Sequence, residues 1–542
     1  MKKNDIFEIE ITGTTDEGDG VGRAEGMAVF VPYALLGEHV RVVIVKVLKN
    51  YAAGKLMEII TPSPNRVKSQ CEYFYKCGGC RFWNVDYKTE LEYKRQKVED
   101  CIRRIAKLDL EVPPVLGAEN QCGYRNKGQF PVSSEGIGIY AQHSHRVIDI
   151  DKCIIQDETN PQVLKSLRKW MAEYNIEPYN EETGKGCVRH IYTRSGDSGI
   201  MVCIVSNWEK LPHSDELVAI LRQNVEGLSG VLQNFNNKKT NVVLGTRFRT
   251  LWGKDYITDS LGDCTFQLSP LSFYQVNKAQ TQVLYSVARD FADLSGGEIV
   301  WDLYCGTGTI GQFMAKSAKK IVGIEVIPQA IANAKENARL NGIKNCEYYC
   351  GTAEEVAPRL KGEAPDVVIL DPPRKGCEES LLRTVAKTKT KRIVYVSCKP
   401  STLARDLKIL TELGYHAEKI QPVDLFPRTP HVETVVLLSQ LKPDDIVQVE
   451  LNAEDLALTS AEAKATYEEI KTYVKRALGF KVSSLYIAQV KQKMGLPMGK
   501  NYNVSKRHSE NCRDCISRWK AKKAPRKNLM PKLRTCKKMS RI

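Results

Sequence analysis

Two changes in the pattern of apolar and polar positions divide the chain. Over residues 1–62, short segments of alternating apolar and polar residues are separated by turn-forming glycines, as in Gly18-Asp19-Gly20-Val21-Gly22. About five short strands in a segment of this length are typical of a small β-barrel of the oligonucleotide-binding (OB) type. The pattern fits a barrel that binds nucleic acid and a purely structural barrel equally well.

A mixed region follows the predicted barrel. Thr61-Pro62-Ser63-Pro64 predicts a linker, residues 87–107 a helix, and residues 120–265 a strand-rich region with scattered glycines. From 271 to about 438, apolar strands alternate with helices, which is typical of a doubly wound α/β sheet. We therefore expect an OB-like barrel (1–62), a central mixed α+β domain (63–270), an α/β domain (271–441) and an extension (442–542).

The extension has a pattern of its own. Residues 466–478 and 483–494 predict two helices in a helix-turn-helix-like pair. Residues 501–542 contain fourteen Lys or Arg and two acidic residues, a net charge of +12, and we expect them to be solvated and disordered. Cys512 and Cys515 form a single C-x-x-C pair, which favours free thiols over a zinc site.

Composition and charge narrow the class of protein. The chain has 542 residues, of which 42% are hydrophobic and 27% charged, and a formal net charge of +16, which favours polyanionic partners. No apolar segment approaches the roughly 18 residues of a membrane span, and the first residues lack an apolar signal core. We therefore expect a cytoplasmic location and no membrane partner. The odd count of 17 cysteines favours metal-binding or nucleophilic thiols over a disulfide framework.

A glycine-rich turn follows the strand predicted at 298–304. The turn, Cys305-Gly306-Thr307-Gly308-Thr309-Ile310-Gly311, leads into a helix, where glycines let a ligand approach the backbone amides. The next strand ends at Glu325, whose carboxylate can accept hydrogen bonds from ribose hydroxyls. This spacing also satisfies the dinucleotide fingerprint, so a nicotinamide enzyme is a competing interpretation.

Two acidic residues separate these interpretations. Asp302 lies within the first strand, and a later strand, 366–370, ends in Asp371-Pro372-Pro373-Arg374-Lys375-Gly376. Both features are familiar from adenosylmethionine methyltransferases that act on nucleobases. The alternative is that the glycine-rich turn and the proline-terminated strand bind no ligand. This interpretation is the weaker one, because the carboxyl ends of the strands border the ligand crevice of such a sheet.

Cys398 follows the predicted strand 391–396 and therefore faces the same crevice. Carbon 5 of uracil is a poor nucleophile, but addition of a thiolate to carbon 6 places electron density on carbon 5. A base must later remove the carbon-5 proton so that the thiolate can leave, and Glu433 at the start of the last strand is the candidate. Taken alone, Cys398 or Glu433 would be assigned a structural role. Their common position at strand ends that face the crevice favours a catalytic role for both.

Three cysteines are clustered after the linker. Cys71, Cys77 and Cys80 have the spacing C-x5-C-x2-C, and Cys153 is a candidate fourth ligand. Four thiolates can hold either zinc or a cubane iron–sulfur cluster, and the spacing alone leaves the metal open.

Residues 1 to about 440 resemble the uracil-5 RNA methyltransferase family, and most of all its bacterial 23S ribosomal RNA branch. The matching segments are Phe273-Tyr274-Gln275-Val276-Asn277, 302–311, 371–376, 396–400 and 431–438. The resemblance implies an N-terminal TRAM barrel and a Rossmann-like class I methyltransferase domain. It also implies a [4Fe–4S] cluster bound by Cys71, Cys77, Cys80 and Cys153.

The resemblance further assigns roles to individual residues. It implies that Cys398 is the nucleophile, that Glu433 accepts the proton, and that S-adenosyl-L-methionine is bound by Gln275, Tyr304, Glu325 and Asp371. The expected substrate is a uridine in 23S ribosomal RNA, with the extension supplying sequence-independent RNA affinity to a monomeric enzyme. The alternatives are a transfer-RNA uracil-5 methyltransferase, whose branch typically lacks the barrel and cluster, and a non-catalytic RNA-binding protein on the same fold.

Overall fold

The structure is a computed structural model that describes residues 1–360 and 364–441 of the chain. Residues 1–440 separate from the remainder as one unit. The predictions for 442–542, including the helix pair, the basic segment and the Cys512/Cys515 alternative, lie outside the described residues. Among the helices of the described part, none has the length and apolar character that a membrane crossing requires.

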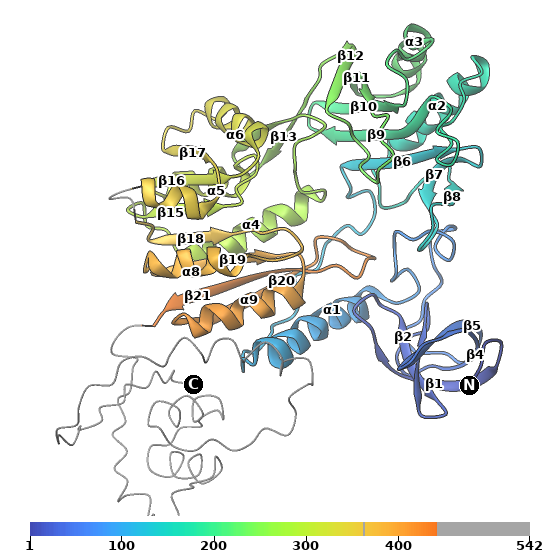
Figure 1. The fold of residues 1–542 in the computed structure, drawn as a ribbon, viewed down its shortest axis with the longest axis horizontal. Coiled ribbons are helices and arrows are strands. Elements are labelled where there is room, and N and C mark those ends of the chain that lie inside the picture. Colours follow the sequence, from blue (N-terminus) through green and yellow to red (C-terminus); the bar gives the residue numbers. More distant parts are fainter. Residues whose placement is uncertain (361–363, 442–542) are drawn as a thin grey trace, which may run out of the picture. The chain divides into compact units, whose positions relative to one another are not determined.

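The barrel expected at the N-terminus is confirmed (Figure 1). Its strands close in the order β1-β2-β3-β5-β4 and are β1 (Ile6–Thr14), β2 (Gly20–Ala24), β3 (Met27–Val31), β4 (His39–Val47) and β5 (Tyr51–Thr61). Alternate side chains such as Ile11, Val29 and Val42 fill the interior. A Cβ on Gly22 would lie 2.6 Å from the carbonyl oxygen of Glu10, so the close strand packing requires glycine there.

The central region combines a long helix with a mixed sheet. The helix α1 (Tyr87–Cys101) begins at Asp86, whose side chain accepts a hydrogen bond from the backbone N–H of Thr89, and continues as a π-helical turn, η1 (Ile102–Ala106). The sheet has the order β12-β11-β10-β9-β6-β7-β8. Its elements are β6 (Lys127–Ser133), β7 (Gly136–Tyr140), β8 (Val147–Asp149), α2 (Asn160–Glu173), β9 (Val188–Gly196), β10 (Gly199–Ser206), α3 (Ser214–Asn224), β11 (Leu228–Phe235) and β12 (Arg247–Gly253), followed by the hairpin β13 (Ile257–Leu261) and β14 (Cys264–Leu268).

The doubly wound sheet expected from residue 271 onward is also confirmed, with the order β17-β16-β15-β18-β19-β21-β20. Strands β15 to β19 run parallel, and β21 is antiparallel to both neighbours. The elements are α4 (Lys278–Ala292), β15 (Ile299–Leu303), α5 (Thr309–Met314), η2 (Ala315–Ser317), β16 (Lys320–Glu325), α6 (Pro328–Leu340), β17 (Cys346–Cys350), α7 (Ala353–Val356), η3 (Ala357–Arg359), β18 (Val367–Leu370), α8 (Glu379–Lys387), β19 (Arg392–Ser397), α9 (Pro400–Glu412), β20 (Tyr415–Val423) and β21 (Glu433–Gln440).

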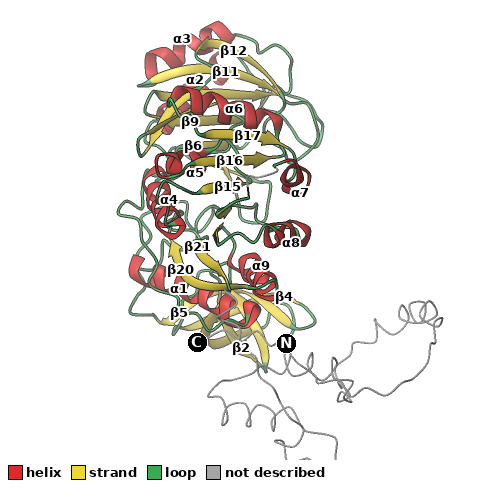
Figure 2. Ribbon diagram, turned by 90° about the vertical axis from the view of Figure 1, so that its left-hand side faces the viewer, coloured by secondary structure: helices red, strands yellow, loops and turns green. Residues whose placement is uncertain are grey.

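Helices cover both faces of this sheet, which explains its continuously apolar strands (Figure 2). Along β18, Val367 packs on the face covered by α4 and α5, whereas Val368 packs on the face covered by α8 and α9. The helix α1 joins this second face, because Val98 and Ile102 belong to its core. A segment that precedes the central sheet in the sequence therefore helps to build the methyltransferase-like domain.

Candidate active site

The predicted nucleophile and base stand at adjacent strand ends. Cys398 directly follows β19, and Glu433 is the first residue of β21. These strands pair antiparallel with Ser397 opposite Thr434, so Cys398 and Glu433 are the next residues along the two strands at the same end. The sheet register therefore brings the two residues to the same end of the sheet.

Two further charged groups share this end of the sheet. Asp371 directly follows β18, the parallel neighbour of β19. The pKa of the Cys398 thiol is raised to about 11, chiefly by burial and also by the charges of Glu433 and Asp371, while Arg374 opposes the shift. These groups therefore lie within electrostatic reach of the sulfur, and Arg374 is a site residue that was not predicted from the sequence.

The two carboxyl groups share a strongly desolvated environment. The pKa of Glu433 is raised to about 8, chiefly by burial and also by the charge of Asp371, while Arg374 opposes the shift. Burial alone raises the pKa of Asp371 to about 7. Carboxyl groups with pKa values near the working pH can both accept and release protons, which suits acid–base chemistry.

A histidine beside the base remains neutral. His431 Nε2 lies 3.3 Å from a guanidinium nitrogen of Arg374. The pKa of His431 is lowered to about 4, chiefly by burial and also by the charge of Arg374. Because the imidazole of His431 is neutral, its contact with Arg374 does not cancel the positive charge of the guanidinium.

The glycine-rich turn has the form of a nucleoside-binding loop. Gly306 and Gly308 have positive φ angles of 55° and 77°, and α5 begins immediately afterwards. Glu325 at the end of β16 accepts hydrogen bonds from the backbone N–H groups of Gly306 at 3.3 Å and Ile327 at 3.0 Å. A Cβ on Gly306 would meet no atom within 4 Å, so the backbone there borders open space.

Asp302 holds this turn from within the sheet. Its Oδ2 accepts a hydrogen bond of 3.0 Å from the backbone N–H of Gly311, and burial raises its pKa to about 7. Asp371 and Glu325 both contribute to this raised pKa, so Asp302 lies between the cofactor loop and the catalytic end.

The other predicted cofactor residues lie around the same end of the sheet. Tyr304 follows β15 with a φ of 64°, and Gln275 precedes α4 with 8% of its surface exposed. The segment that carries Gln275 is linked to the glycine-rich turn, because the hydroxyl of Thr307 donates to the carbonyl of Phe273 at 3.4 Å.

The four clustered cysteines line one cavity of about 300 Å³. Cys71, Cys77, Cys80 and Cys153 are free thiols, and burial raises the pKa of each. Within residues 1–360 and 364–441, no three His, Cys, Asp or Glu side chains are grouped in the manner of a single-ion site. The structure thus brings the predicted ligands to a common cavity rather than around one point.

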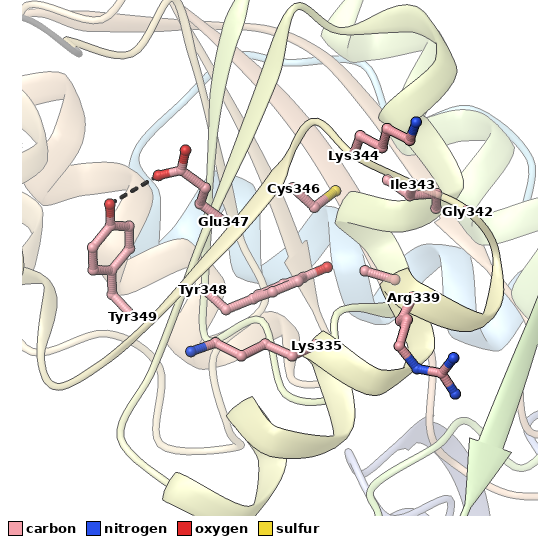
Figure 3. A pocket seen from close by; sticks show the side chains of 10 residues that line it. Lys335, Arg339, Gly342, Ile343, Lys344, Cys346, Glu347, Tyr348 and Tyr349 are labelled. Carbon is pink, nitrogen blue, oxygen red and sulfur yellow. Dashed lines mark hydrogen bonds between the residues drawn. The ribbon is translucent and has the colours of Figure 1, made fainter.

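A larger hollow, of about 630 Å³, lies beside the edge strand β17 (Figure 3). Lys335, Arg339 and Lys344 line it together with Tyr348 and Tyr349. None of the predicted catalytic, cofactor or metal residues lines this hollow. Size alone therefore does not locate the chemistry in this molecule.

Sequence matches agree with this geometry. Residues 211–441 match the model of the tRNA (Uracil-5-)-methyltransferase family, and residues 2–57 match the TRAM domain. An uncharacterized RNA methyltransferase of Clostridium tetani is 48% identical over 447 residues, covering 81% of this chain and 97% of the relative. One of Halalkalibacterium halodurans is 44% identical over 447 residues, covering 81% and 98%.

The chain belongs to the uracil-5 RNA methyltransferase family. A solved structure supports the same assignment: the Pyrococcus abyssi tRNA (uracil-54, C5)-methyltransferase in complex with S-adenosyl-L-homocysteine is 30% identical, with a TM-score of 0.66. It covers 80% of this chain and 99% of its own length. The protein is therefore an S-adenosylmethionine-dependent RNA methyltransferase with a class I fold and a TRAM barrel.

Proposed function

We propose that this enzyme methylates carbon 5 of a uridine in 23S ribosomal RNA through a covalent adduct between Cys398 and carbon 6. The observation that carries the proposal is the pairing of a thiol and a buried carboxyl group at the adjacent ends of β19 and β21. Such a pair suits a reaction that needs first a nucleophile and later a base.

The residues around the glycine-rich turn fit S-adenosylmethionine. Glu325 presents a carboxylate beside the open backbone at Gly306, where ribose hydroxyls can be bound. Tyr304, Gln275 and Asp371 would complete the pocket, with Asp371 nearest the thiol. When bound, S-adenosylmethionine supplies an electrophilic methyl group.

The chain's own groups account for the other steps. The Cys398 thiol loses its proton to solvent, the resulting thiolate adds to carbon 6 of the uracil, and the electron pair of the C5–C6 double bond moves toward the carbonyl at carbon 4. Arg374 favours this addition because its positive charge lowers the pKa of the thiol. After methylation, Glu433 takes the proton from carbon 5, the C5–C6 double bond forms again, and the bond from carbon 6 to sulfur breaks.

We also propose that Cys71, Cys77, Cys80 and Cys153 hold a [4Fe–4S] cluster. A zinc ion would need all four sulfurs at about 2.3 Å from one point, whereas a cluster places several irons between them. The observation that supports a shared metal group is that all four cysteines line one cavity. The cavity is also lined by Arg125, Lys127 and Lys152, whose charges oppose those of the thiolates. Because methyl transfer from a sulfonium needs no electron, we assign the cluster a structural or RNA-positioning role rather than a redox role.

The choice of 23S ribosomal RNA rests on the resemblance to the ribosomal branch, which implies the barrel and the four-cysteine cluster together. The alternative is a transfer RNA, favoured by the specificity in the name of the Pyrococcus abyssi enzyme. The net charge of +16 fits either RNA, and we propose a monomeric enzyme of the cytoplasm.

One experiment separates these substrates. The purified protein and S-adenosylmethionine are incubated with 23S ribosomal RNA and with transfer RNA, both lacking 5-methyluridine, and the digested RNA is mapped by mass spectrometry. We expect 5-methyluridine in the ribosomal RNA only. Modification of transfer RNA alone would establish the alternative, and an absence of methylation in both would favour a non-catalytic RNA-binding protein.

A further inference from the structure

The connection between β20 and β21, residues 424–432, leads directly into Glu433 and is held by a distant part of the chain (Figure 1). The carbonyl of Phe426 accepts a hydrogen bond from Lys94 at 3.2 Å, and that of Pro427 accepts one from the hydroxyl of Tyr124 at 3.0 Å. The carbonyl of Pro430 accepts a hydrogen bond from Lys97 at 3.0 Å. The loop is therefore fastened through its backbone to α1 and to the region after it.

Arg428 makes the densest of these contacts. Its carbonyl accepts hydrogen bonds from the backbone N–H groups of Arg81 at 2.8 Å and Phe82 at 3.2 Å. Its guanidinium donates to the carbonyls of Phe82 at 3.2 Å and Val85 at 3.0 Å, and lies 4.7 Å from the ring centre of Trp83. Arg428 thus holds the segment that directly follows Cys80 through backbone hydrogen bonds, hydrogen bonds from its guanidinium, and a cation–π contact with Trp83.

Buried charges lock the arginine in place. The carboxylate of Glu90 accepts the backbone N–H of Arg428 at 2.7 Å and lies 3.4 Å from its guanidinium. Lys94, which is 1% exposed, contacts both Glu90 and Asp424 at 2.7 Å. Two cations and two anions thereby balance, and loss of one would leave an uncompensated buried charge. The left-handed φ of 69° at Arg428 shows that the surroundings impose the loop's shape.

Only four residues separate Arg428 from Glu433, and they are constrained in turn. The hydroxyl of Thr429 donates to the carbonyl of Phe426 at 2.8 Å, and the backbone N–H of His431 donates to the hydroxyl of Thr429 at 3.4 Å. His431 also contacts Arg374. A displacement at Arg428 would consequently move the start of β21.

We infer that Arg428 is a positioning residue, which sets Glu433 for removal of the carbon-5 proton by joining its loop to the segment after Cys80. This inference rests on the proposed role of Glu433. Adduct formation by Cys398 depends on β19, which the loop does not carry, so a fault in the loop should affect proton removal selectively.

The test follows both steps in one reaction. In a single turnover, with enzyme in excess, RNA carrying tritium at carbon 5 of uridine is mixed with methyl-labelled S-adenosylmethionine and the cluster-loaded Arg428→Lys enzyme. Lysine keeps the charge but cannot reproduce the forked contacts. Tritium release should fall behind methyl incorporation by about 10- to 100-fold, the size expected of a small misplacement, and a denaturant-stable protein–RNA complex should accumulate.

Arg189→Lys is the matched control. Arg189 is also buried, donates to the carbonyls of Asn236 and Lys238 at 2.8 Å, and stacks on Tyr179, but it belongs to the central sheet. Its variant should keep tritium release and methyl incorporation in step. A similar lag in this control would overturn the inference, because any loss of a buried arginine would then produce it.

Two more variants separate the possible failures. Tyr124→Phe removes one hydrogen bond to the loop without changing charge, so it remains informative if Arg428→Lys does not fold, and it should show a smaller lag of the same kind. Glu433→Gln should show the largest lag. If Glu433→Gln lags but neither loop variant does, Arg428 does not position the base. If Glu433→Gln shows no lag, the proposed function of Glu433 itself is wrong.

Discussion

The catalytic end of the sheet and the cysteine cavity each gather reactive side chains, but by different means. Cys398, Glu433 and Asp371 stand at the ends of neighbouring strands, where backbone pairing places them. The thiols of the cavity come from irregular segments, between β5 and α1 and after β8. Groups placed by sheet register meet without a ligand, whereas groups on loops depend on what binds between them. Substitutions should therefore affect the two regions differently.

Removal of the thiol should abolish the reaction and leave the fold intact. Cys398→Ala should lower methyl transfer by at least about 10⁴-fold, because no other group replaces a covalent nucleophile. It should also fail to form the denaturant-stable complex with 5-fluorouridine RNA, in which fluorine cannot leave as a proton does. Cys346→Ala, in the edge strand β17, is the control and should form the complex normally. A complex formed by Cys398→Ala would show that another residue is the nucleophile.

Removal of the base should lower activity less than removal of the thiol does. The pH dependence of the wild-type enzyme should reflect the raised pKa of the buried Glu433. Glu433→Gln should lower turnover by about 10²- to 10⁴-fold, the usual contribution of a general base. In the wild type, proton removal should become faster as pH rises and level off above about 8, because burial raises the pKa of Glu433 to about 8 and only the carboxylate accepts a proton. A pH-independent tritium-release rate from pH 6 to about 9 would contradict this assignment.

Because Glu433 is buried, its replacement by glutamine should stabilise the folded protein. A carboxyl group with a higher pKa in the folded than in the unfolded protein destabilises the fold as pH rises from its ordinary value, 4.5, toward about 8. Glu433→Gln should therefore raise the Tm more at about pH 8.5 than at about pH 5. An equal Tm change at both pH values would mean that the charge of Glu433 is not buried in solution.

A variant of the cysteine cavity should lose more stability and less activity than the catalytic variants do. Cys153→Ser should lose bound iron and lower the Tm by several degrees, since metal binding contributes to folding, while reducing activity less than either catalytic variant. Cys122→Ser is the control, because Cys122 is exposed and does not line the cavity. Iron and zinc are measured after anaerobic purification. Stoichiometric zinc without iron would refute the cluster.

The difference between the two regions also explains what could be predicted from the sequence. Strand ends follow from the alternation of apolar strands and helices, so Cys398, Glu433 and Asp371 could be placed together. The packing of α1 on the methyltransferase sheet could not, because Val98 and Ile102 meet partners far away in the sequence. Arg374 was visible within a motif, but its effect on the thiol depends on which strands are neighbours.

The buried charge network was missed for a related reason. Charged residues on a predicted helix normally indicate a solvated face, and Glu90 and Lys94 have the spacing of an ordinary surface pair. They are buried because Asp424 and Arg428, more than 300 residues away, supply the matching charges. The barrel's glycines gave a mixed signal. A turn at Gly18 does join β1 to β2, but Gly20, Val21 and Gly22, also predicted as turn, lie within β2.

The smallest expected effect concerns affinity for RNA. Part of this affinity can come from outside the catalytic end of the sheet and the cysteine cavity. We expect the basic extension to add sequence-independent contacts, because residues 501–542 carry a net charge of +12 while the sequence matches to relatives cover 81% of this chain and nearly all of theirs. Each phosphate contact made by a Lys or Arg contributes a slope of roughly −0.7 to the dependence of log affinity on log salt for a single strand. A chain ending after Leu441 should therefore bind RNA with a flatter salt dependence and a higher KM, with a smaller change in kcat. We expect the choice of uridine to stay the same, since Cys398, Glu433 and the proposed cofactor residues all lie within residues 1–440. An unaltered salt slope would show that the extension does not contact RNA, and methylation of a different uridine would make it a determinant of specificity.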